Sequence, residues 1–302
     1  MSENAENFIE TYQGILDFST ENFIISESLP NPAYHSQSWA LNHSRMVSLV
    51  KHPPALIRWD SDHVKAVTEA MRFGSAAHSM IFEGGKDTVV TQAACFRTNA
   101  GKEEKKKIEE ENRIPITPEE NRVLCDMRAA IEADPYISVL IGGGVSEKSI
   151  FCRDGFRWVR IRPDLLYVRD SDVVCVDYKT CMDASAEGFA RNVYDYGYHQ
   201  QAALYIDVLG KLYPGRDVTF LFVAQEKRAP YLYNIFELDP QDMELGRLLN
   251  GYALRIWESC VATGKWGSCT SGRINSLSLP GWARGRAEQK ITELEARYGT
   301  EE

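Results

Sequence analysis

"RPDLLYVRDSDVVCVDYKT", residues 162–180, is the stretch that decides the fold. It places two carboxylates and an ammonium in a run that is otherwise apolar and rich in β-branched residues. Asp177 and Lys179 lie two positions apart, and because side chains alternate along a strand, both project to one face. Asp164 begins the preceding strand, and a hairpin through residues 169–172 would bring it beside Asp177. Charges are costly to bury in an apolar strand without a purpose, so we expect a functional site here.

Length and composition set the class of protein. The chain has 302 residues and is 44% hydrophobic, which is enough for a sizeable core in one mixed α/β domain. No apolar run approaches the roughly 18 residues of a membrane span, and the polar, acidic start "MSENAENFIE" does not resemble a secretory signal. Seven cysteines without a CxxC pair are typical of reduced thiols, so we expect a cytoplasmic protein.

The net charge of −9 argues against a broadly basic surface for nucleic acid. Much of the acid, however, lies in residues 103–111 and in the C-terminal tail. A basic channel can therefore coexist with an acidic exterior, and the net charge does not exclude a DNA partner.

The order of expected elements indicates the architecture. Residues 1–30 have little periodicity and are expected as an N-terminal arm, followed by a single domain over residues 31–302 that ends in a charged helical tail. Strands are expected over residues 148–180 and as a pair around a turn within residues 217–239, whereas residues 189–214 are expected as one long amphipathic helix. We therefore expect an α/β fold with a central mixed β-sheet flanked by helices.

The acids of the quoted stretch indicate metal chemistry. Two carboxylates in one pocket repel each other unless one holds a proton or a cation lies between them. Oxygen ligands suit Mg²⁺, for which Mn²⁺ can substitute, and the backbone carbonyl of Tyr178 could supply another oxygen. Lys179 could orient a water or stabilise charge at phosphorus, which predicts metal-assisted phosphodiester hydrolysis. The simpler alternative is a surface hairpin with a weak Asp177–Lys179 ion pair.

Pro163-Asp164 followed by Asp177-Tyr178-Lys179 resembles the PD-(D/E)xK nuclease superfamily. The segment "FGSAAHSMIFEG", residues 73–84, is similar to the first helical motif of one branch, which contains the RecB nuclease domain, lambda exonuclease and the RecE-type exonuclease (exodeoxyribonuclease VIII-like).

A third motif completes the likeness. "GYHQQAALY", residues 197–205, resembles the Q-x-x-x-Y motif of that branch at Gln201 and Tyr205. Similarity to RecE-type enzymes extends over roughly residues 33–270. The resemblance implies a restriction-endonuclease-like core.

The resemblance also implies roles for single residues. One or two Mg²⁺ would be held by His78, Asp164, Asp177 and the Tyr178 carbonyl, with Lys179 positioning the attacking water. In the same way, Gln201 and Tyr205 would buttress the site or touch the DNA end, and Glu147 would support the metal ligands from behind.

The activity and partners that follow are also implied by resemblance alone. Linear duplex DNA would be digested from 5′ to 3′, which leaves 3′ single strands for recombination of the phage or prophage type. The enzyme would be a ring-shaped homo-oligomer, a trimer or tetramer, that works with a single-strand annealing protein. It would act in the cytoplasm of a bacterium or a phage-infected cell, without a membrane partner.

For several further residues the sequence allows both a functional and a structural interpretation. Ser44 and Arg45 precede a helical run and could bind a DNA phosphate, or could be a helix cap and a solvated arginine. Tyr198 falls on the helix face of Gln201 and is another candidate DNA contact. A set of aromatic residues could stack on bases, although packing in the core or at a sheet edge is the simpler explanation. This set comprises Trp158, Tyr194 and Tyr196.

Other functions stay open. An endonuclease or a single-strand nuclease of the same superfamily would share these motifs. A non-catalytic DNA-binding module would be expected to have lost Asp164, Asp177 or Lys179, and all three are present. A metabolic enzyme that binds a Mg²⁺-nucleotide would need a phosphate-cradling glycine loop, and the cluster at residues 142–144 lacks the lysine that such a loop requires.

Overall fold

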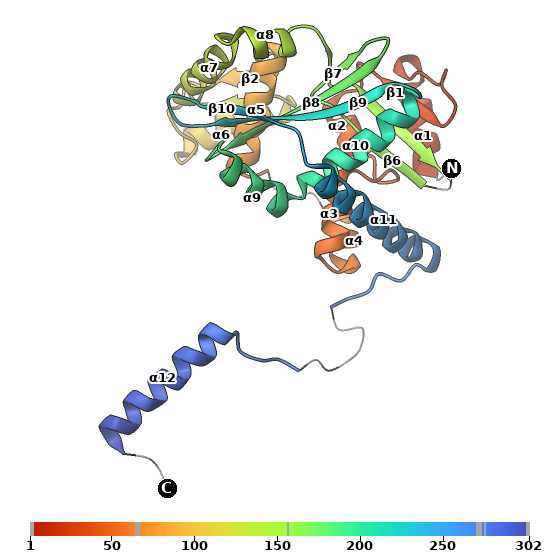
Figure 1. Ribbon diagram of the computed structural model, residues 1–302. Helices are drawn as coiled ribbons and strands as arrows, with labels where there is room; N and C mark the ends of the chain where they lie inside the picture. The colour runs from red at the N-terminus through yellow and green to blue at the C-terminus, as the bar shows by residue number, and fades with distance from the viewer. Residues whose placement is uncertain (1–2, 64–66, 156, 270–273, 275, 300–302) are drawn as a thin grey trace. The chain divides into compact units, whose positions relative to one another are not determined.

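The computed structural model describes residues 3–63, 67–155, 157–269, 274 and 276–299 (Figure 1). The chain divides into two compact units, Met1–Trp266 and Gly267–Glu302. In the described residues of the second unit the structure has one helix, α12 (Gly281–Tyr298). This division differs from the expected single domain over residues 31–302, because the tail is a unit of its own. None of the described helices is both long and apolar enough to cross a membrane.

The first thirty residues, expected as an arm, are packed into the first unit. They contribute α1 (Glu3–Tyr12), a 3₁₀ turn η1 (Gln13–Ile15) and β1 (Phe23–Ser26). Strand β1 pairs antiparallel with β5 (Ser149–Asp154), which pairs with β6 (Arg157–Ile161). Phe8 and Ile24 are buried against Phe151. These apolar residues are too few to form a periodic pattern, and only a strand distant in sequence buries them.

A five-stranded mixed sheet forms the centre of the first unit, as expected. Its strands run in the order β10-β9-β8-β7-β4, and all neighbours are antiparallel except β8 and β9. The strands are β4 (Val145–Ser146), β7 (Leu165–Val168), β8 (Asp172–Cys181), β9 (Asp217–Glu226) and β10 (Tyr233–Phe236). The expected hairpin of β7 and β8 and the expected pair β9–β10 are both confirmed.

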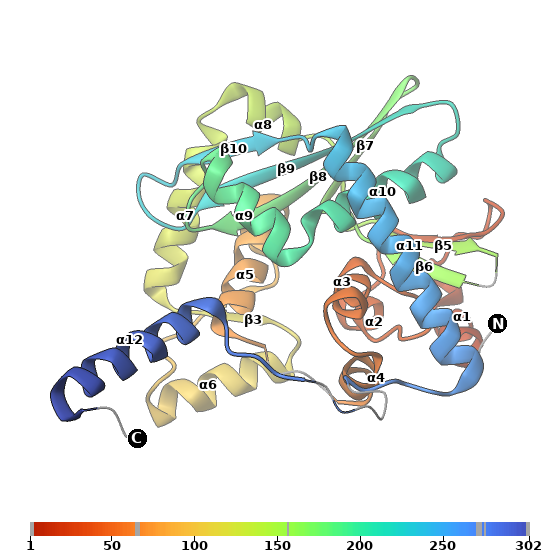
Figure 2. The ribbon, with the colours of Figure 1, turned by 60° about the horizontal axis from the view of Figure 1, so that its bottom comes forward.

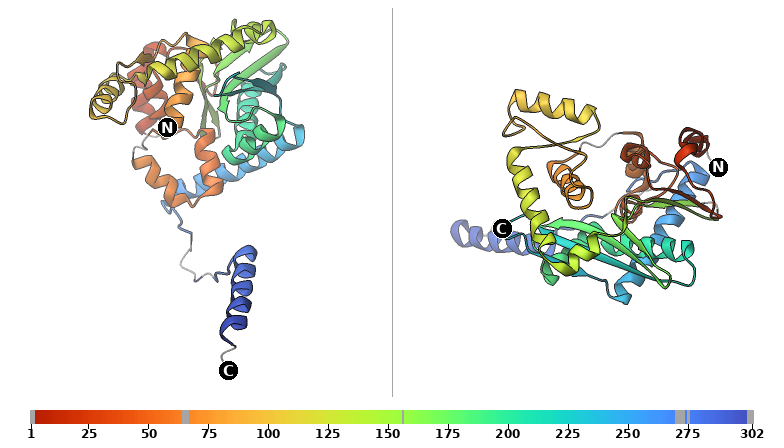
Figure 3. Two further views of the ribbon diagram at one scale, coloured as in Figure 1. Left: turned by 90° about the vertical axis from the view of Figure 1, so that its left-hand side faces the viewer. Right: turned by 90° about the horizontal axis from the view of Figure 1, so that it is seen from above.

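Helices cover both faces of this sheet (Figure 3). On one face, α5 and α7 bury Val176 and Tyr178 of β8, and on the other, α3 and α10 cover Val173 and Cys175. The alternation of side chains along β8 thus puts Asp177 on the α10 face. Helices α3 and α4 pack beside α11 (Figure 2). The bounds are α3 (His43–Lys51), α4 (Pro54–Asp62), α5 (Glu69–Glu83), α7 (Pro118–Glu132), α10 (Tyr198–Leu212) and α11 (Pro240–Thr263).

The prediction of one long helix over residues 189–214 is wrong. The segment forms α9 (Ala186–Tyr196) and α10, and the chain turns between them at Gly197. Gly197 has a φ of +69°, which favours glycine, and an added Cβ would lie 2.5 Å from a methyl carbon of Val47. An amphipathic pattern runs across the turn because both helices bury a face on the same core.

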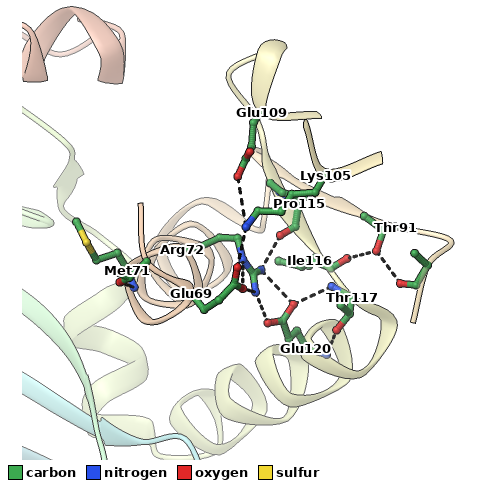
Figure 4. A network of polar contacts seen from close by, with 12 residues as sticks. Glu69, Met71, Arg72, Thr91, Lys105, Glu109, Pro115, Ile116, Thr117 and Glu120 are labelled. Atoms are coloured by element: carbon green, nitrogen blue, oxygen red, sulfur yellow. Dashed lines mark hydrogen bonds and ion pairs between the residues drawn. The ribbon is translucent and has the colours of Figure 1, made fainter. Parts of the chain in front are cut away.

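A buried arginine ties β3 (Ile114–Ile116) and α7 to α5 (Figure 4). Arg72 donates to Glu120, to Glu69 and to the carbonyl of Pro115, and its side chain is 5% exposed. Glu120 also closes a capping box with Thr117 at the start of α7. The network fixes the first turn of the helix that carries His78. The further elements are α2 (Asn31–His35), β2 (Thr88–Val90), α6 (Asn99–Glu110) and α8 (Pro135–Ile141).

Candidate active site

A cleft of about 820 Å³ collects most of the predicted site residues. Its walls come from the segment before α2, the start of α3, one face of α5, the strand β8 and the helix α10. The predicted residues that line it are Ser44, His78, Glu147, Asp164, Asp177, Tyr178, Lys179, Gln201 and Tyr205. Residues far apart in the sequence therefore meet at one place.

The β7–β8 hairpin brings Asp164 to β8, as expected from the sequence. Its Oδ2 accepts a hydrogen bond of 2.6 Å from the backbone N–H of Tyr178, and its Oδ1 lies 2.9 Å from Nε2 of His78. One carboxylate thus links the strand to the helix α5. The Tyr178 carbonyl as a metal ligand stays a prediction.

His78, Glu147 and Asp164 form a cluster that could hold a metal ion. One ligand atom from each lies within 4.8 Å of the others, and all three side chains are partly buried. Glu147 Oε1 lies 3.4 Å from His78 Nε2, close enough for Glu147 to be a candidate ligand itself, and its predicted supporting role stays a prediction. An imidazole with two carboxylates is a donor set that suits Mn²⁺, and the carboxylate oxygens suit Mg²⁺. The donor chemistry of these residues therefore fits the divalent ion that the sequence motifs imply.

Asp177 lies outside this cluster and is more deeply buried, at 1% exposure. Its Oδ2 is 2.5 Å from Nζ of Lys179, and its Oδ1 accepts a hydrogen bond from Nε2 of Gln201. The projection of Asp177 and Lys179 to one face of β8 is thus confirmed. Gln201 reaches Asp177 from α10, so this helix orients the carboxylate.

The electrostatics of the cleft are those of a site with excess negative charge. Burial alone would lower the pKa of His78, but the carboxylates of Asp164 and Glu147 raise it to about 9. Burial raises the pKa of Glu147 to about 7, although His78 opposes the shift. Burial likewise raises the pKa of Asp177 to about 6, against the influence of Lys179. Without a metal the pocket therefore holds protons at neutral pH, as expected where negative ligands lack a cation.

Tyr205 supports the strand end that carries Asp164. Its hydroxyl donates to the carbonyl of Arg162 at 3.2 Å and accepts from the N–H of Arg162 at 3.3 Å. The ring is buried and packs edge-on against Phe220. These contacts make Tyr205 a positioning residue, because the hydroxyl is engaged by the backbone two residues before Asp164.

Arg162 and His43 were not predicted from the sequence. Arg162 is 8% exposed, donates to the carbonyl of Leu29 and to Asn31 Oδ1, and lies 3.4 Å from Glu147 Oε2. It therefore connects the N-terminal segment to the metal-ligand cluster. An arginine directly before the Pro-Asp pair, at the end of β6, is a signal that could have indicated this residue.

His43 lines the cleft at the first turn of α3. Burial, helped by the nearby Lys179, lowers its pKa to about 3, so the ring is neutral at physiological pH. Its Nε2 lies 3.2 Å from Oγ of Ser44. The side chain of Asn42, which accepts from the N–H of Arg45, caps the helix that presents both residues.

The remaining DNA-binding candidates are placed differently from one another. Ser44 lines the cleft, whereas the guanidinium of Arg45 donates to the carbonyl of Ser38 and is not part of the cleft wall. The ring of Tyr198 lies 4.9 Å from Nζ of Lys179. Trp158 packs edge-on against Trp39 beside a buried cluster, as the simpler explanation expected.

Comparison with known proteins agrees with this geometry. Residues 55–275 match the family described as a PDDEXK-like domain of unknown function (DUF3799), which is more than half of the chain. The chain belongs to this PDDEXK-like family. The PD-(D/E)xK nuclease fold expected from its motifs is therefore shown, and the central sheet with its helices is the core of that fold. The matched range begins after Asn31 and His43, so the N-terminal wall of the cleft lies outside it.

A solved structure has the same fold. A protein from Eubacterium rectale, described as a candidate exonuclease, superposes with a TM-score of 0.58 at 14% sequence identity. The alignment covers 84% of this chain and 96% of the other. At this identity the likeness concerns the fold alone. No curated protein matches the chain.

Proposed function

We propose that the protein is a metal-dependent exodeoxyribonuclease that hydrolyses linear duplex DNA from 5′ to 3′. The observation that carries the nuclease activity is the meeting of Asp164, Asp177 and Lys179 with His78 and Glu147 in one cleft. The preference for DNA ends and the 5′-to-3′ direction are supported by the resemblance of the sequence motifs to RecE-type enzymes. A ring-shaped homo-oligomer and a single-strand annealing partner belong to the same proposal and have the same support.

His78, Glu147 and Asp164 would hold the metal, and Asp177 would complete the site from the adjacent strand position. A divalent ion bound there would act as a Lewis acid toward the phosphate and lower the pKa of a coordinated water. Mg²⁺, with Mn²⁺ as a substitute, is the ion proposed on the basis of the oxygen-rich donor set. The raised pKa values of His78 and Glu147 mean that binding must displace protons.

The chain's own residues have separable tasks in this reaction. Burial alone would lower the pKa of Lys179, but the carboxylate of Asp177 raises it, so the ammonium stays charged and can stabilise the negative charge that develops at phosphorus. Gln201 holds Asp177 in the orientation that keeps this pair together. Tyr205 and Arg162 keep the segment before Asp164 in place.

A non-catalytic DNA-binding module is disfavoured by the same geometry. Such a protein has no need to keep Asp164, Asp177 and Lys179 together in the cleft, because phosphate binding requires only positive charge. The cleft is instead lined by six carboxylates against two lysines and one arginine, with three histidines, an arrangement that repels DNA unless a cation is bound.

The test is digestion of linear duplex DNA labelled at the 5′ or at the 3′ end, beside a closed circle and a single strand of the same sequence. Reactions contain Mg²⁺, Mn²⁺ or EDTA, with the wild type, Lys179→Ala, or the matched control Lys106→Ala. Lys106 is an exposed lysine on α6, paired with Glu110. We expect Mg²⁺-dependent loss of the 5′ label, spared circles, and a rate lowered about 10²- to 10³-fold by Lys179→Ala alone.

Each other result has a definite meaning. If circles are cut, the protein is an endonuclease and the end preference is refuted. If the single-stranded form of the substrate is cut but the duplex is not, the protein is a single-strand nuclease. If DNA is bound and never cut with either metal, the nuclease proposal fails and the binding-module alternative replaces it.

A further inference from the structure

Two stacked tyrosines lead from the candidate catalytic lysine to the surface. The ring of Tyr198 lies 4.9 Å from Nζ of Lys179, and the ring of Tyr196 stacks on Tyr198 with centroids 5.6 Å apart at 29°. Tyr198 is partly buried, whereas Tyr196 is 60% exposed. The pair therefore joins the site that would hold the scissile phosphate to a ring that is open to solvent.

The ring of Tyr198 is held by the protein core, so the tyrosine pair has a fixed position. Tyr198 packs against Phe189 and Phe222, with ring centroids 6.0 and 5.6 Å away. The turn at Gly197 separates the two tyrosines and is pressed against Val47 of α3, where an added Cβ would collide. Tyr196 thus owes its exposure to a fixed turn and not to the fraying of a helix end.

A cation lies next to this turn. Nζ of Lys51, at the exposed end of α3, donates to the carbonyls of Tyr194 and Asp195 at 3.3 and 2.6 Å. It also lies 5.8 Å from the ring of Tyr194, which is 75% exposed. The carboxylate of Asp195 is the opposing charge on this segment. Exposed aromatic rings next to a backbone-held ammonium are what single-stranded nucleic acid requires, since bases stack on rings and phosphates need positive charge.

We propose that Tyr196 and Tyr198 form a stacking subsite for an unpaired nucleobase of the strand that flanks the scissile phosphate. The occupant is assigned from continuity, because the stack begins at Lys179. The steps of 4.9 and 5.6 Å from that lysine to the outer ring, Tyr196, span at most about three nucleotides at a rise of ~3.4 Å per nucleotide. The assignment of the flanking strand rests on the proposed nuclease function, whereas the stacking of a base does not. The subsite would hold a DNA end with its terminal base unpaired.

The test measures binding of a fluorescent oligodeoxythymidylate to the full chain in Ca²⁺, which supplies a cation to the oxygen ligands of the cleft, and the strand is checked for full length after each measurement. Tyr196→Leu removes the ring, Tyr196→Phe keeps it, and Tyr252→Leu is the matched control. Tyr252 is 57% exposed on α11 and also has a cation over its ring, Arg255 at 4.4 Å. Loss of one stacked base weakens binding roughly 5- to 150-fold. We expect this loss for Tyr196→Leu, and affinities within about twofold of the wild type for the other two variants.

A strand of abasic nucleotides distinguishes stacking from other causes. We expect the wild type to bind this strand about as weakly as Tyr196→Leu binds the normal strand, and Tyr196→Leu to lose nothing more. If Tyr196→Leu weakens binding of the normal and the abasic strand equally, the ring contacts the nucleic-acid backbone or supports the fold, and the proposal is overturned. Unchanged binding by Tyr196→Leu would overturn it too, as would a wild type that does not bind the strand.

The two proposals can fail separately. If the wild type cuts no DNA but shows the base-dependent effect of Tyr196, the nuclease function is refuted and the stacking subsite stands. If the wild type cuts linear duplex and Tyr196→Leu binds both strands as the wild type does, the subsite is refuted and the nuclease function stands.

Discussion

Replacement of Tyr205 by phenylalanine separates a positioning role from a chemical one. The substitution keeps the ring and removes the hydroxyl, which donates to the carbonyl of Arg162 at 3.2 Å and accepts from its N–H at 3.3 Å. Both lengths lie slightly beyond the usual range for bonds of their type, so each bond is weak. Two buried backbone groups then lose a partner, which costs about 1–3 kcal/mol of the free energy of unfolding. At about 2–4 °C per kcal/mol for a domain of this size, the melting temperature should fall by at least ~2 °C.

The assay is urea denaturation of the metal-free protein, followed by tryptophan fluorescence, together with the rate of duplex digestion. Tyr252→Phe is the matched control, because its exposed hydroxyl should contribute less than about 0.5 kcal/mol. We expect Tyr205→Phe to lower the unfolding free energy while the cleavage rate stays within about tenfold of the wild type. Unchanged stability with a rate lowered more than about 100-fold would refute the reasoning, since the hydroxyl would then act in the reaction.

Two further predictions follow from the cleft and from the turn at Gly197. The metal-free pKa is about 9 for His78 and about 7 for Glu147, so both groups release protons when a metal binds, and the affinity for Mn²⁺ should rise from pH 6 to pH 9. Calorimetry in two buffers of different ionisation enthalpy measures the released protons. An affinity that does not change with pH would exclude these two residues as ligands. Gly197→Ala should lower the unfolding free energy by at least ~1 kcal/mol, because alanine is strained at a φ of +69° and its Cβ meets Val47. Adding Val47→Ala should restore only the part of the loss that comes from the clash with Val47. If the double variant is no more stable than Gly197→Ala, the backbone conformation alone is responsible for the loss.

Local patterns were sufficient for much of the candidate site. The same-face projection of Asp177 and Lys179 needs only the two-residue period of a strand, and the position of Asp164 needs only a short hairpin. The cap of α7 was likewise readable from Thr117 and Glu120. Each of these features joins residues that are close in sequence, so composition and spacing determine them.

Features that depend on distant contacts could not be read in this way. The place of Glu147 beside His78 and Asp164 depends on the approach of α5 to the segment between β4 and β5. The contacts of Arg162 with Leu29 and Asn31 depend on the packing of the N-terminal segment, whose apolar residues form no pattern.

The sequence by itself therefore predicted the fold class and the hairpin, which are confirmed, and it proposed His78, Asp164, Asp177, Lys179 and Gln201 as site residues, which the structure places in one cleft. Tertiary structure alone decided that the helix over residues 189–214 breaks at Gly197. A glycine within an amphipathic run is compatible with a helix, and only the folded chain shows the turn and the packing of Val47 that leaves no room for a Cβ there. That break is also what exposes Tyr196 next to Tyr198. Long-range packing has no local signature, since the free energy of burying a side chain depends on which distant surface it meets.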